Sequence, residues 1–208
     1  MVIGWVAERR ALIDDLATLT PQQWETPSLA QGWSVHDVAA HLIDNALTTP
    51  GRLLRGMAAA RFDFDRQNAA GVAANRGASP AETLTRLRAV ADRTSGPPTF
   101  LAAEGSRLVE EIAHGEDIRR RLNLHRAYPP QSLAEALGYQ ARTREAMGGA
   151  KGLVGRVTLV ATDAPVRLGR GPEVRGTALA LLMLATGRRH GSSELSGPGV
   201  SLLPTDPA

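Results

Sequence analysis

The chain of 208 residues contains no cysteine. This absence excludes disulfides, thiolate metal sites and a cysteine nucleophile, so any thiol chemistry must use a thiol supplied from outside. Lysine is almost absent as well, because Lys151 is the only one and every other basic residue apart from histidine is arginine. The formal net charge of +3 is modest, and the charge balance therefore gives no support to nucleic-acid binding.

Long apolar runs and aromatic residues are also scarce. No uncharged apolar stretch reaches the roughly 18 residues that a membrane span needs, and the most apolar run, residues 178–185, has the length of a buried element. The N-terminal segment carries acidic residues early and lacks the pattern of a secretory signal. We therefore expect a cytoplasmic protein without a membrane partner. The basic run Arg119–Arg121 has no interleaved aromatic residues, so we expect no nucleic-acid partner.

The first three quarters of the chain carry helical signals. Apolar spacing predicts helices over about 2–19, 35–47, 52–60, 80–91, 100–122 and 132–147. The clearest start is Ser34 with Asp37 three residues later, a capping box, flanked by Trp33 and Val38 as a hydrophobic staple. Thr20 before Pro21, the Ser79–Glu82 box and the Ser132–Glu135 box predict further starts. The polar segment 62–77 is interpreted as a connection.

The texture changes after Lys151. Apolar residues at alternating positions predict a short strand over 157–161. Further strands are predicted over 166–168 and 200–203. Residues 177–186 predict a buried helix that Gly187 ends. The predicted fold is mainly α: a bundle of four or five helices over 1–150, followed by a small α+β unit over 151–208. Such a short unit is expected to pack on the bundle, because it is too small to be stable by itself.

Two of the five histidines lie well inside predicted helices. His41 lies on the helix after Ser34, and His114 lies on the long helix four residues after Glu110. Because residues at i and i+4 share a helix face, Glu110, His114 and His41 can form a site for Zn²⁺, Ni²⁺ or Fe²⁺ with one position open. The alternative is two ordinary helix histidines and a solvated glutamate. Asp37 and Asp117, each one turn away from a histidine, are candidates to orient the imidazoles, although capping or ion pairing is the favoured explanation for both.

The other polar features have simpler interpretations. His36 falls in a first helical turn, and His125 and His190 lie near helix ends, so we expect all three on the surface. The run Arg119–Arg121 is interpreted as a solvated helix face with ion pairs to Glu116 and Asp117 four residues before.

Several segments resemble one family. GWSVHDVAAHL resembles the start of the metal-bearing helix of the DinB/YfiT-like superfamily, and most closely its actinobacterial branch, the mycothiol-dependent maleylpyruvate isomerase family. LVEEIAHGEDIRRRL resembles the second metal motif of that branch, and VATDAPVRLGRGPEVRGTALALLMLATGRR with LSGPGV resembles its C-terminal portion. The resemblance covers nearly the whole chain in order, and it implies a DinB-like four-helix bundle.

The resemblance also implies site residues and cofactors. The metal ligands of the family fall on His41, Glu110 and His114, the same residues that the spacing selects. A divalent metal, usually zinc, and mycothiol as thiol cofactor are implied. Of the C-terminal arginines, Arg188 is the best match to a residue implicated in the family's activity and is predicted to contact the cofactor, with Arg175 as the second choice.

Two functions follow as hypotheses. The first is a metal-dependent, mycothiol-dependent enzyme, an isomerase or an S-transferase, whose partner is a small electrophile. The second is a DinB-like metal-binding helical protein without enzymatic activity, acting in stress response or protein interaction. The C-terminal unit is shorter than in the full isomerase, and the resemblance does not identify the substrate.

Overall fold

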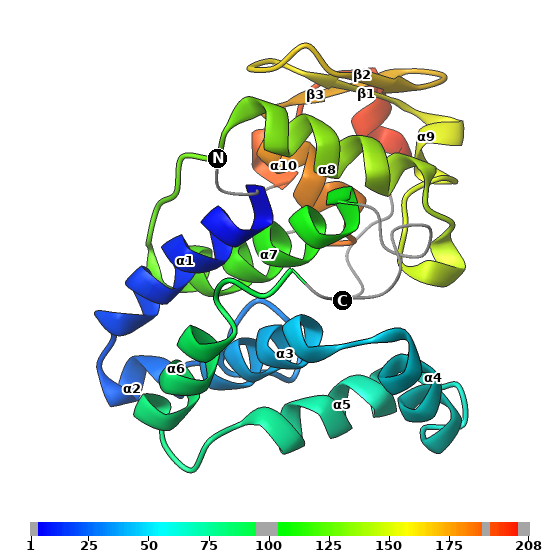
Figure 1. Cartoon of the computed structure of the whole chain (residues 1–208). Helices are drawn as coiled ribbons and strands as arrows, with labels where there is room; N and C mark the ends of the chain where they lie inside the picture. Colours follow the sequence, from blue (N-terminus) through cyan, green and yellow to red (C-terminus); the bar gives the residue numbers. More distant parts are fainter. Residues whose placement is uncertain (1–3, 95–103, 189–191, 204–208) are drawn as a thin grey trace. The chain divides into compact units, whose positions relative to one another are not determined.

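The computed structural model describes residues 4–94, 104–188 and 192–203, and the chain in these ranges is mainly helical with one small sheet (Figure 1). It divides into two compact units. Unit 1 comprises Met1–Glu104 and Glu110–Arg126, and unit 2 comprises Gly105–Val109 and Ala127–Ala208. None of the helices in the described ranges combines the length and the apolar character needed to cross a bilayer.

Unit 1 is helical in all its described elements: α1 (Gly4–Ala17), α2 (Pro21–Trp24), α3 (Val35–Leu47), α4 (Pro50–Ala59), α5 (Phe64–Asn75), α6 (Pro80–Ala89), most of α7 (Glu104–Arg119) and the 3-10 turn η1 (Arg120–Leu122). Its core joins α1, α3, α6 and the end of α7. Leu12, Leu42, Leu87 and Ile118 are fully buried in this core. The helices of unit 1, together with the small sheet of unit 2, confirm the predicted mainly α fold with a C-terminal α+β portion.

Three of the predicted helix starts in unit 1, at Thr20, Ser34 and Ser79, are confirmed, whereas the helix predicted from residue 52 begins at Pro50. The Ser34 side chain accepts from the Asp37 amide, and the Asp37 carboxylate accepts from the Ser34 amide at 2.9 Å. Thr20 forms the same reciprocal box at the start of α2. Ser79 caps α6, but the Glu82 carboxylate bonds the amide of Ala78 instead of the cap residue.

The segment 62–77 was predicted as a connection, and this prediction is wrong because residues 64–75 form α5. Asp63 caps the helix by accepting from the Arg66 amide. The helix buries only Gly71, Val72 and Asn75, so it lacks the apolar periodicity that would reveal it in the sequence. Gly71 has a packing role: a Cβ there would lie 2.4 Å from Asp44 Oδ2 on α3, so only glycine permits this approach of α5 to α3.

The long helix also differs slightly from its prediction. Its start is described only from Glu104, since residues 95–103 lie outside the described ranges. The α-helix ends at Arg119 and is followed by the 3-10 turn η1. Asn123, with a left-handed φ of 55°, ends this turn. The α-helix therefore ends three residues before the predicted Leu122.

Unit 2 contains α8 (Pro130–Arg142), η2 (Glu145–Met147), α9 (Leu153–Arg156), β1 (Thr158–Ala161), β2 (Arg167–Gly169), β3 (Glu173–Gly176), α10 (Ala178–Ala185), η3 (Ser192–Glu194) and η4 (Pro198–Leu202). The strand order is β2-β1-β3, with β2 antiparallel and β3 parallel to β1. Leu159 pairs with Leu168 on one side and with Val174 on the other. Contacts group α8 with these C-terminal elements, while the boundary at residues 150/151 stays a prediction.

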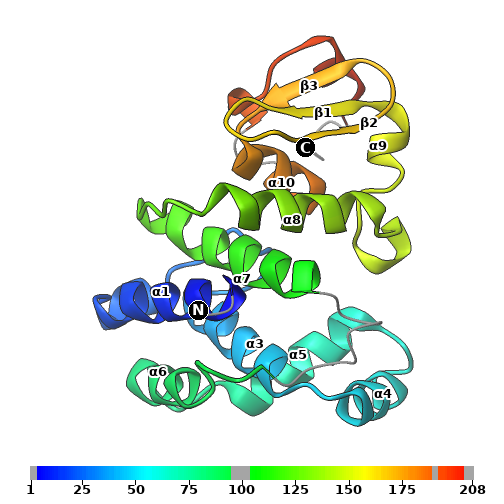
Figure 2. The same cartoon turned by 45° about the horizontal axis from the view of Figure 1, so that its top comes forward.

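The apolar helix α10 forms the centre of unit 2. It lies between the sheet and α8, as Figure 2 shows, and contacts both. Leu181 and Leu182 are fully buried, as expected for a helix that is apolar nearly all round. Thr177 caps its start, and Gly187 with φ of 76° follows its end, which confirms both predicted boundaries.

Three predictions for unit 2 are wrong. Helix α8 begins at Pro130, so Ser132 is its third residue and not a cap; proline supplies the φ that a first helical position needs. That helix ends at Arg142 and not near Met147. Residues 198–202 form the 3-10 helix η4 in place of a strand, starting at Pro198. Strand β3 gave no signal in the sequence because Val174 is its only large buried apolar residue.

Candidate metal centre

The three predicted ligands lie together in unit 1. His41 comes from α3, and Glu110 and His114 come from successive turns of α7. One ligand atom of each residue lies within 4.8 Å of the others. Glu110 Oε2 is 3.6 Å from His41 Nε2 and 3.5 Å from His114 Nε2. Within the described residues, this is the group of His, Asp and Glu side chains whose geometry can hold a metal ion.

Two neighbours orient the imidazoles. Asp117, which is fully buried, lies 3.0 Å from His114 Nδ1 through its Oδ2. A carboxylate accepts this bond, so Nδ1 carries the proton and the Nε2 lone pair of His114 faces the site. The indole of Trp33 lies against both rings, with centroids 4.9 Å from His41 and 6.3 Å from His114. Trp33 was predicted only as a staple, and the core cluster against which it packs does include Val38.

His41 is held differently from His114. Its Nδ1 is buried and has no hydrogen-bond partner in the described part of the chain, so packing against Trp33 sets the orientation of the ring. The amide Nδ2 of Asn45 lies 3.1 Å from His41 Nε2. An amide nitrogen donates, so Nε2 presents its lone pair to the site.

The electrostatics of the site suit a cation. Burial lowers the pKa of His41 below its ordinary value, which favours the neutral imidazole that a metal requires. Removal from water favours protonation of Glu110, but hydrogen bonds and charge from His114 and His41 outweigh it and hold the pKa well below the ordinary value. The Glu110 side chain is 44% exposed, so the site is reachable from solvent.

Of the two aspartates considered as orienting residues, Asp117 contacts the candidate ligand His114. The hydrogen bonds described for Asp37 go to other residues. Asp37 caps α3 and forms an ion pair with Arg76. Burial favours its protonated form, but hydrogen bonds from Ser34 and Arg76 lower its pKa below the ordinary value. Asp37 therefore serves the start of α3, where its charge also favours the helix dipole.

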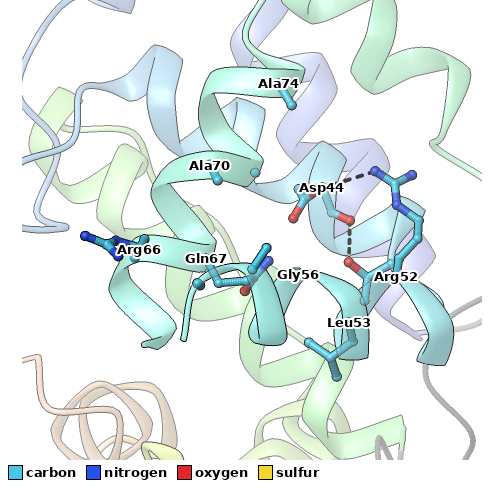
Figure 3. A pocket seen from close by; sticks show the side chains of 12 residues that line it. Asp44, Arg52, Leu53, Gly56, Arg66, Gln67, Ala70 and Ala74 are labelled. Atoms are coloured by element: carbon cyan, nitrogen blue, oxygen red, sulfur yellow. Dashed lines mark hydrogen bonds and ion pairs between the residues drawn. The ribbon is translucent and has the colours of Figure 1, made fainter. Parts of the chain in front are cut away.

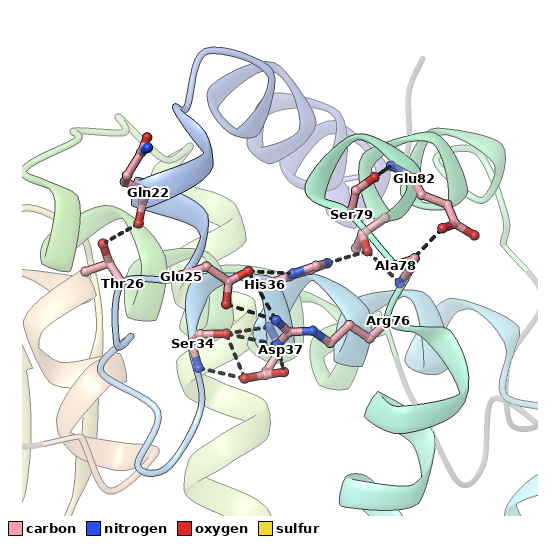
Figure 4. A network of polar contacts seen from close by, with 12 residues as sticks. Gln22, Glu25, Thr26, Ser34, His36, Asp37, Arg76, Ala78, Ser79 and Glu82 are labelled. Atoms are coloured by element: carbon pink, nitrogen blue, oxygen red, sulfur yellow. Dashed lines mark hydrogen bonds and ion pairs between the residues drawn. The ribbon is translucent and has the colours of Figure 1, made fainter.

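The prediction that His36 lies on the surface is wrong. Its ring is buried and bridges Glu25 Oε1, 3.1 Å from Nδ1, to Thr83 Oγ1, 2.6 Å from Nε2. Figure 4 shows this network, in which Arg76 also reaches Glu25 and Asp37. Hydrogen bonding to His36, with Arg76 adding to it, lowers the pKa of Glu25. His125 is exposed as predicted, and His190 lies outside the described residues.

The interpretation of Arg119–Arg121 as a solvated face holds only in part. Arg120 pairs with Glu116 at 2.9 Å, as predicted. Arg119 is fully buried, and its Nε donates to Asp15 on α1 at 2.6 Å. Asp117 bonds His114, so its predicted pairing with Arg121 is not among the contacts described.

A cavity of about 420 Å³ begins one helical turn beyond His41 (Figure 3). Its walls come from α3, α4 and α5, and small side chains of α4 and α5 leave the space open. The Asp44 carboxylate lies in its wall; Oδ1 accepts from Asn75 at 3.0 Å and lies 3.8 Å from the Arg52 guanidinium. The volume is in the range of sites for small organic molecules.

The two arginines considered for cofactor binding lie in unit 2. Arg188 directly follows Thr186 and Gly187, which line a second cavity of about 330 Å³, and its Nη1 donates to the Thr186 carbonyl at 3.4 Å. Arg175 is on β3 and pairs with Glu173 at 2.6 Å.

Sequence reasoning missed Trp33 and Asn45 as members of the site. Asn45 follows His41 by four residues, the same spacing that connected Glu110 with His114, so a search of the His41 face would have found it. Trp33 precedes the helix and its contact with both imidazoles depends on the loop before α3, which the sequence does not determine.

Comparison with known proteins bears on the N-terminal sequence and on the fold. Residues 5–99 match the family model described as Mycothiol maleylpyruvate isomerase N-terminal domain, a span that includes His41 but ends before Glu110. Crystal structures of the mycothiol-dependent maleylpyruvate isomerase and of a histidine-to-alanine mutant each share 14% identity and a TM-score of 0.57 with this chain. Both alignments cover 97% of this chain and 93% of the other, which establishes a similar fold. No curated protein matches in sequence. Over residues 5–99, the chain is therefore similar to the mycothiol maleylpyruvate isomerase N-terminal domain family.

Proposed function

We propose that the chain binds one divalent metal ion through His41, Glu110 and His114, and uses mycothiol as a thiol cofactor, either to isomerise a small electrophile or to join the mycothiol thiol to it. The observation that carries this proposal is the convergence of the three ligand atoms, two from α7 and one from α3. In a tetrahedral metal site with bonds of about 2.0–2.2 Å, neighbouring ligand atoms lie about 3.3–3.6 Å apart. The separations of 3.5 and 3.6 Å from Glu110 Oε2 fit this range.

The donor set is two imidazole nitrogens and one carboxylate oxygen. Such a set accepts Zn²⁺, and also Ni²⁺ or Fe²⁺, and three protein ligands leave a position for an incoming group. When bound, the metal would supply a Lewis acid that favours the thiolate form of a coordinated thiol, and mycothiol would supply that thiol. The chain contains no cysteine, which is compatible with an external thiol because no protein thiol competes for the metal.

The protein residues prepare this site. Asp117 keeps the Nε2 lone pair of His114 directed inward. Burial lowers the pKa of His41 and so favours its neutral form, and the charge of Glu110 gives the site one negative charge to balance a cation. Trp33 covers the imidazoles, while the exposed side of Glu110 leaves access for a ligand. The cavity that begins at Asp44 offers room for part of a small organic ligand.

Arg188 is proposed to contact the thiol cofactor. It lies beside the cavity lined by Gly148, Gly149, Thr186 and Gly187, and a guanidinium offers several donors to carboxylate or hydroxyl groups. Arg188→Ala is expected to weaken mycothiol binding without changing metal content. Arg175→Ala is the matched control, since Arg175 is engaged with Glu173.

The ligand assignment is tested by the metal content of purified variants. His41→Ala or His114→Ala should lose most of the bound metal, while Glu110→Gln should retain less than wild type but more than either. The apoproteins should stay helical, because the core of unit 1 is apolar and independent of the ion. His125→Ala is the control, since this histidine is exposed. Wild-type metal content in His114→Ala would refute the assignment.

The thiol function is tested on cobalt-substituted protein. Titration with mycothiol should produce a sulfur-to-cobalt charge-transfer band, which His114→Ala protein should lack. Conversion of maleylpyruvate that requires both mycothiol and metal would identify the isomerase activity. Metal binding without the band and without turnover would favour the alternative, a metal-binding helical protein that is not an enzyme.

A further inference from the structure

Asn45 reaches into the candidate metal centre from α3, one turn after His41. Its Nδ2 lies 3.1 Å from His41 Nε2 and donates to Glu110 Oε2 at 2.9 Å. Both hydrogen bonds of this amide therefore end on atoms that the proposed function assigns as metal ligands. The side chain is half-buried, so it is held at the site and does not extend freely into solvent.

The terminal amide occupies a position like that of a ligand. Glu110 Oε2 is 3.6 and 3.5 Å from the two imidazole nitrogens, and Asn45 adds separations of 2.9 and 3.1 Å from Oε2 and His41 Nε2. These values are close to the edges of one coordination polyhedron, about 3.3 Å for bonds of about 2.0 Å. The amide thus lies beside the two ligand atoms much as a further ligand would.

The chemistry of the amide decides which of its atoms faces a cation. An amide NH₂ donates and offers no lone pair to a metal, whereas the amide oxygen is a recognised ligand for divalent cations. Without a cation, the NH₂ group is the favoured end, because it satisfies two acceptors, Glu110 and His41. A half-turn about the Cβ–Cγ bond exchanges the nitrogen and oxygen with little change of shape.

We propose that Asn45 is a fourth protein ligand of the metal, binding through Oδ1 after this half-turn. The inference rests on the proposed function and extends its ligand set to two nitrogens and two oxygens. A thiol must then either displace the amide or enter as a fifth ligand. A neutral amide binds a divalent ion more weakly than a carboxylate does, so an incoming thiolate can displace it. The amide also adds no negative charge that would repel the thiolate.

The test compares Zn²⁺ and Co²⁺ affinities, by competition with a chelator, for wild type, Asn45→Asp and Asn45→Ala. If Asn45 is a ligand, the carboxylate of Asn45→Asp should tighten binding about tenfold or more, and Asn45→Ala should weaken it by at least the roughly tenfold that loss of an outer partner costs. The visible d–d spectrum of the cobalt protein should change in both variants. Asn68→Asp, which adds the same charge on α5, is the control and should leave affinity and spectrum unchanged.

The opposite results overturn the inference. If Asn45 only donates to Glu110, Asn45→Asp loses the donor, sets a second carboxylate against the first and binds metal no more tightly than wild type. Unchanged affinity in Asn45→Ala would also refute ligation. In either case the wild type would still bind metal, and the proposed function would stand. A wild-type protein that binds neither ion would refute both proposals together.

Discussion

The bond between Asp117 and His114 gives a sharp prediction about metal affinity. Asp117→Asn keeps the size of the side chain but replaces the carboxylate that accepts from His114 Nδ1 at 3.0 Å. The imidazole then loses both its fixed tautomer and part of its basicity. Loss of such an outer partner weakens metal binding about 10–100-fold. At about 1.4 kcal/mol for each tenfold change, this is a loss of about 1.4–2.8 kcal/mol of binding free energy.

The assay is a competition titration of the apoprotein with Zn²⁺ and a chelator of known affinity, after circular dichroism has shown that the variant is folded. Asp37→Asn is the matched control, because Asp37 precedes His41 by one turn but caps α3 and pairs with Arg76. The control should lose stability to unfolding, by about 0.5–2 kcal/mol for a weakened cap, while keeping wild-type affinity. Equal affinities of Asp117→Asn and wild type, or a loss of affinity in Asp37→Asn as large as in Asp117→Asn, would refute the reasoning.

Three further predictions concern stability. Gly71→Ala gains about 1 kcal/mol in helix propensity, but its methyl group would lie 2.4 Å from the Asp44 carboxylate of α3. Overpacking costs about 1–3 kcal/mol, so this variant should be less stable in thermal unfolding. Gly138→Ala is the control: its methyl group would make only an ordinary contact with Arg142, so the variant should be more stable than wild type. The pKa values of Glu25 and Asp37 are lower in the folded state than the ordinary 4.5 and 3.8, so their contribution is complete above about pH 4.5 and is lost as the pH falls through the folded-state values. As the pH is lowered, the melting temperature of wild type should therefore fall more steeply than that of Asp37→Asn, and parallel curves for the two proteins would contradict this. Truncation after Gly149 removes α10 and exposes the apolar face of α8; the fragment should aggregate in light scattering, and a soluble, cooperatively folding fragment would show the idea to be wrong.

The sequence predicted the elements that have local signals. The Ser34–Asp37 box defined α3 to the residue, and the i,i+4 spacing on α7 selected Glu110 and His114. These features depend on a few neighbouring residues, which the sequence shows directly. The apolar run of α10 is equally local.

Features that depend on distant neighbours were missed. Helix α5 buries few side chains, and its fit to α3 depends on the absence of a side chain at Gly71. The position of His36 in a first helical turn suggested exposure, but Glu25 and Thr83, from other parts of unit 1, enclose it. Arg119 is buried for the same reason, because Asp15 on α1 pairs with it. In each case the partner is far away along the chain.

The position of Trp33 gives the protein an intrinsic optical reporter. Its indole lies 4.9 and 6.3 Å from the imidazoles of the candidate centre, while the buried indole of Trp24 contacts the His36 ring. An open-shell ion such as Co²⁺ or Cu²⁺ bound by these imidazoles accepts excitation energy from the indole, so loading of the centre should dim the emission of Trp33. Occupancy can then be followed in real time on unlabelled protein.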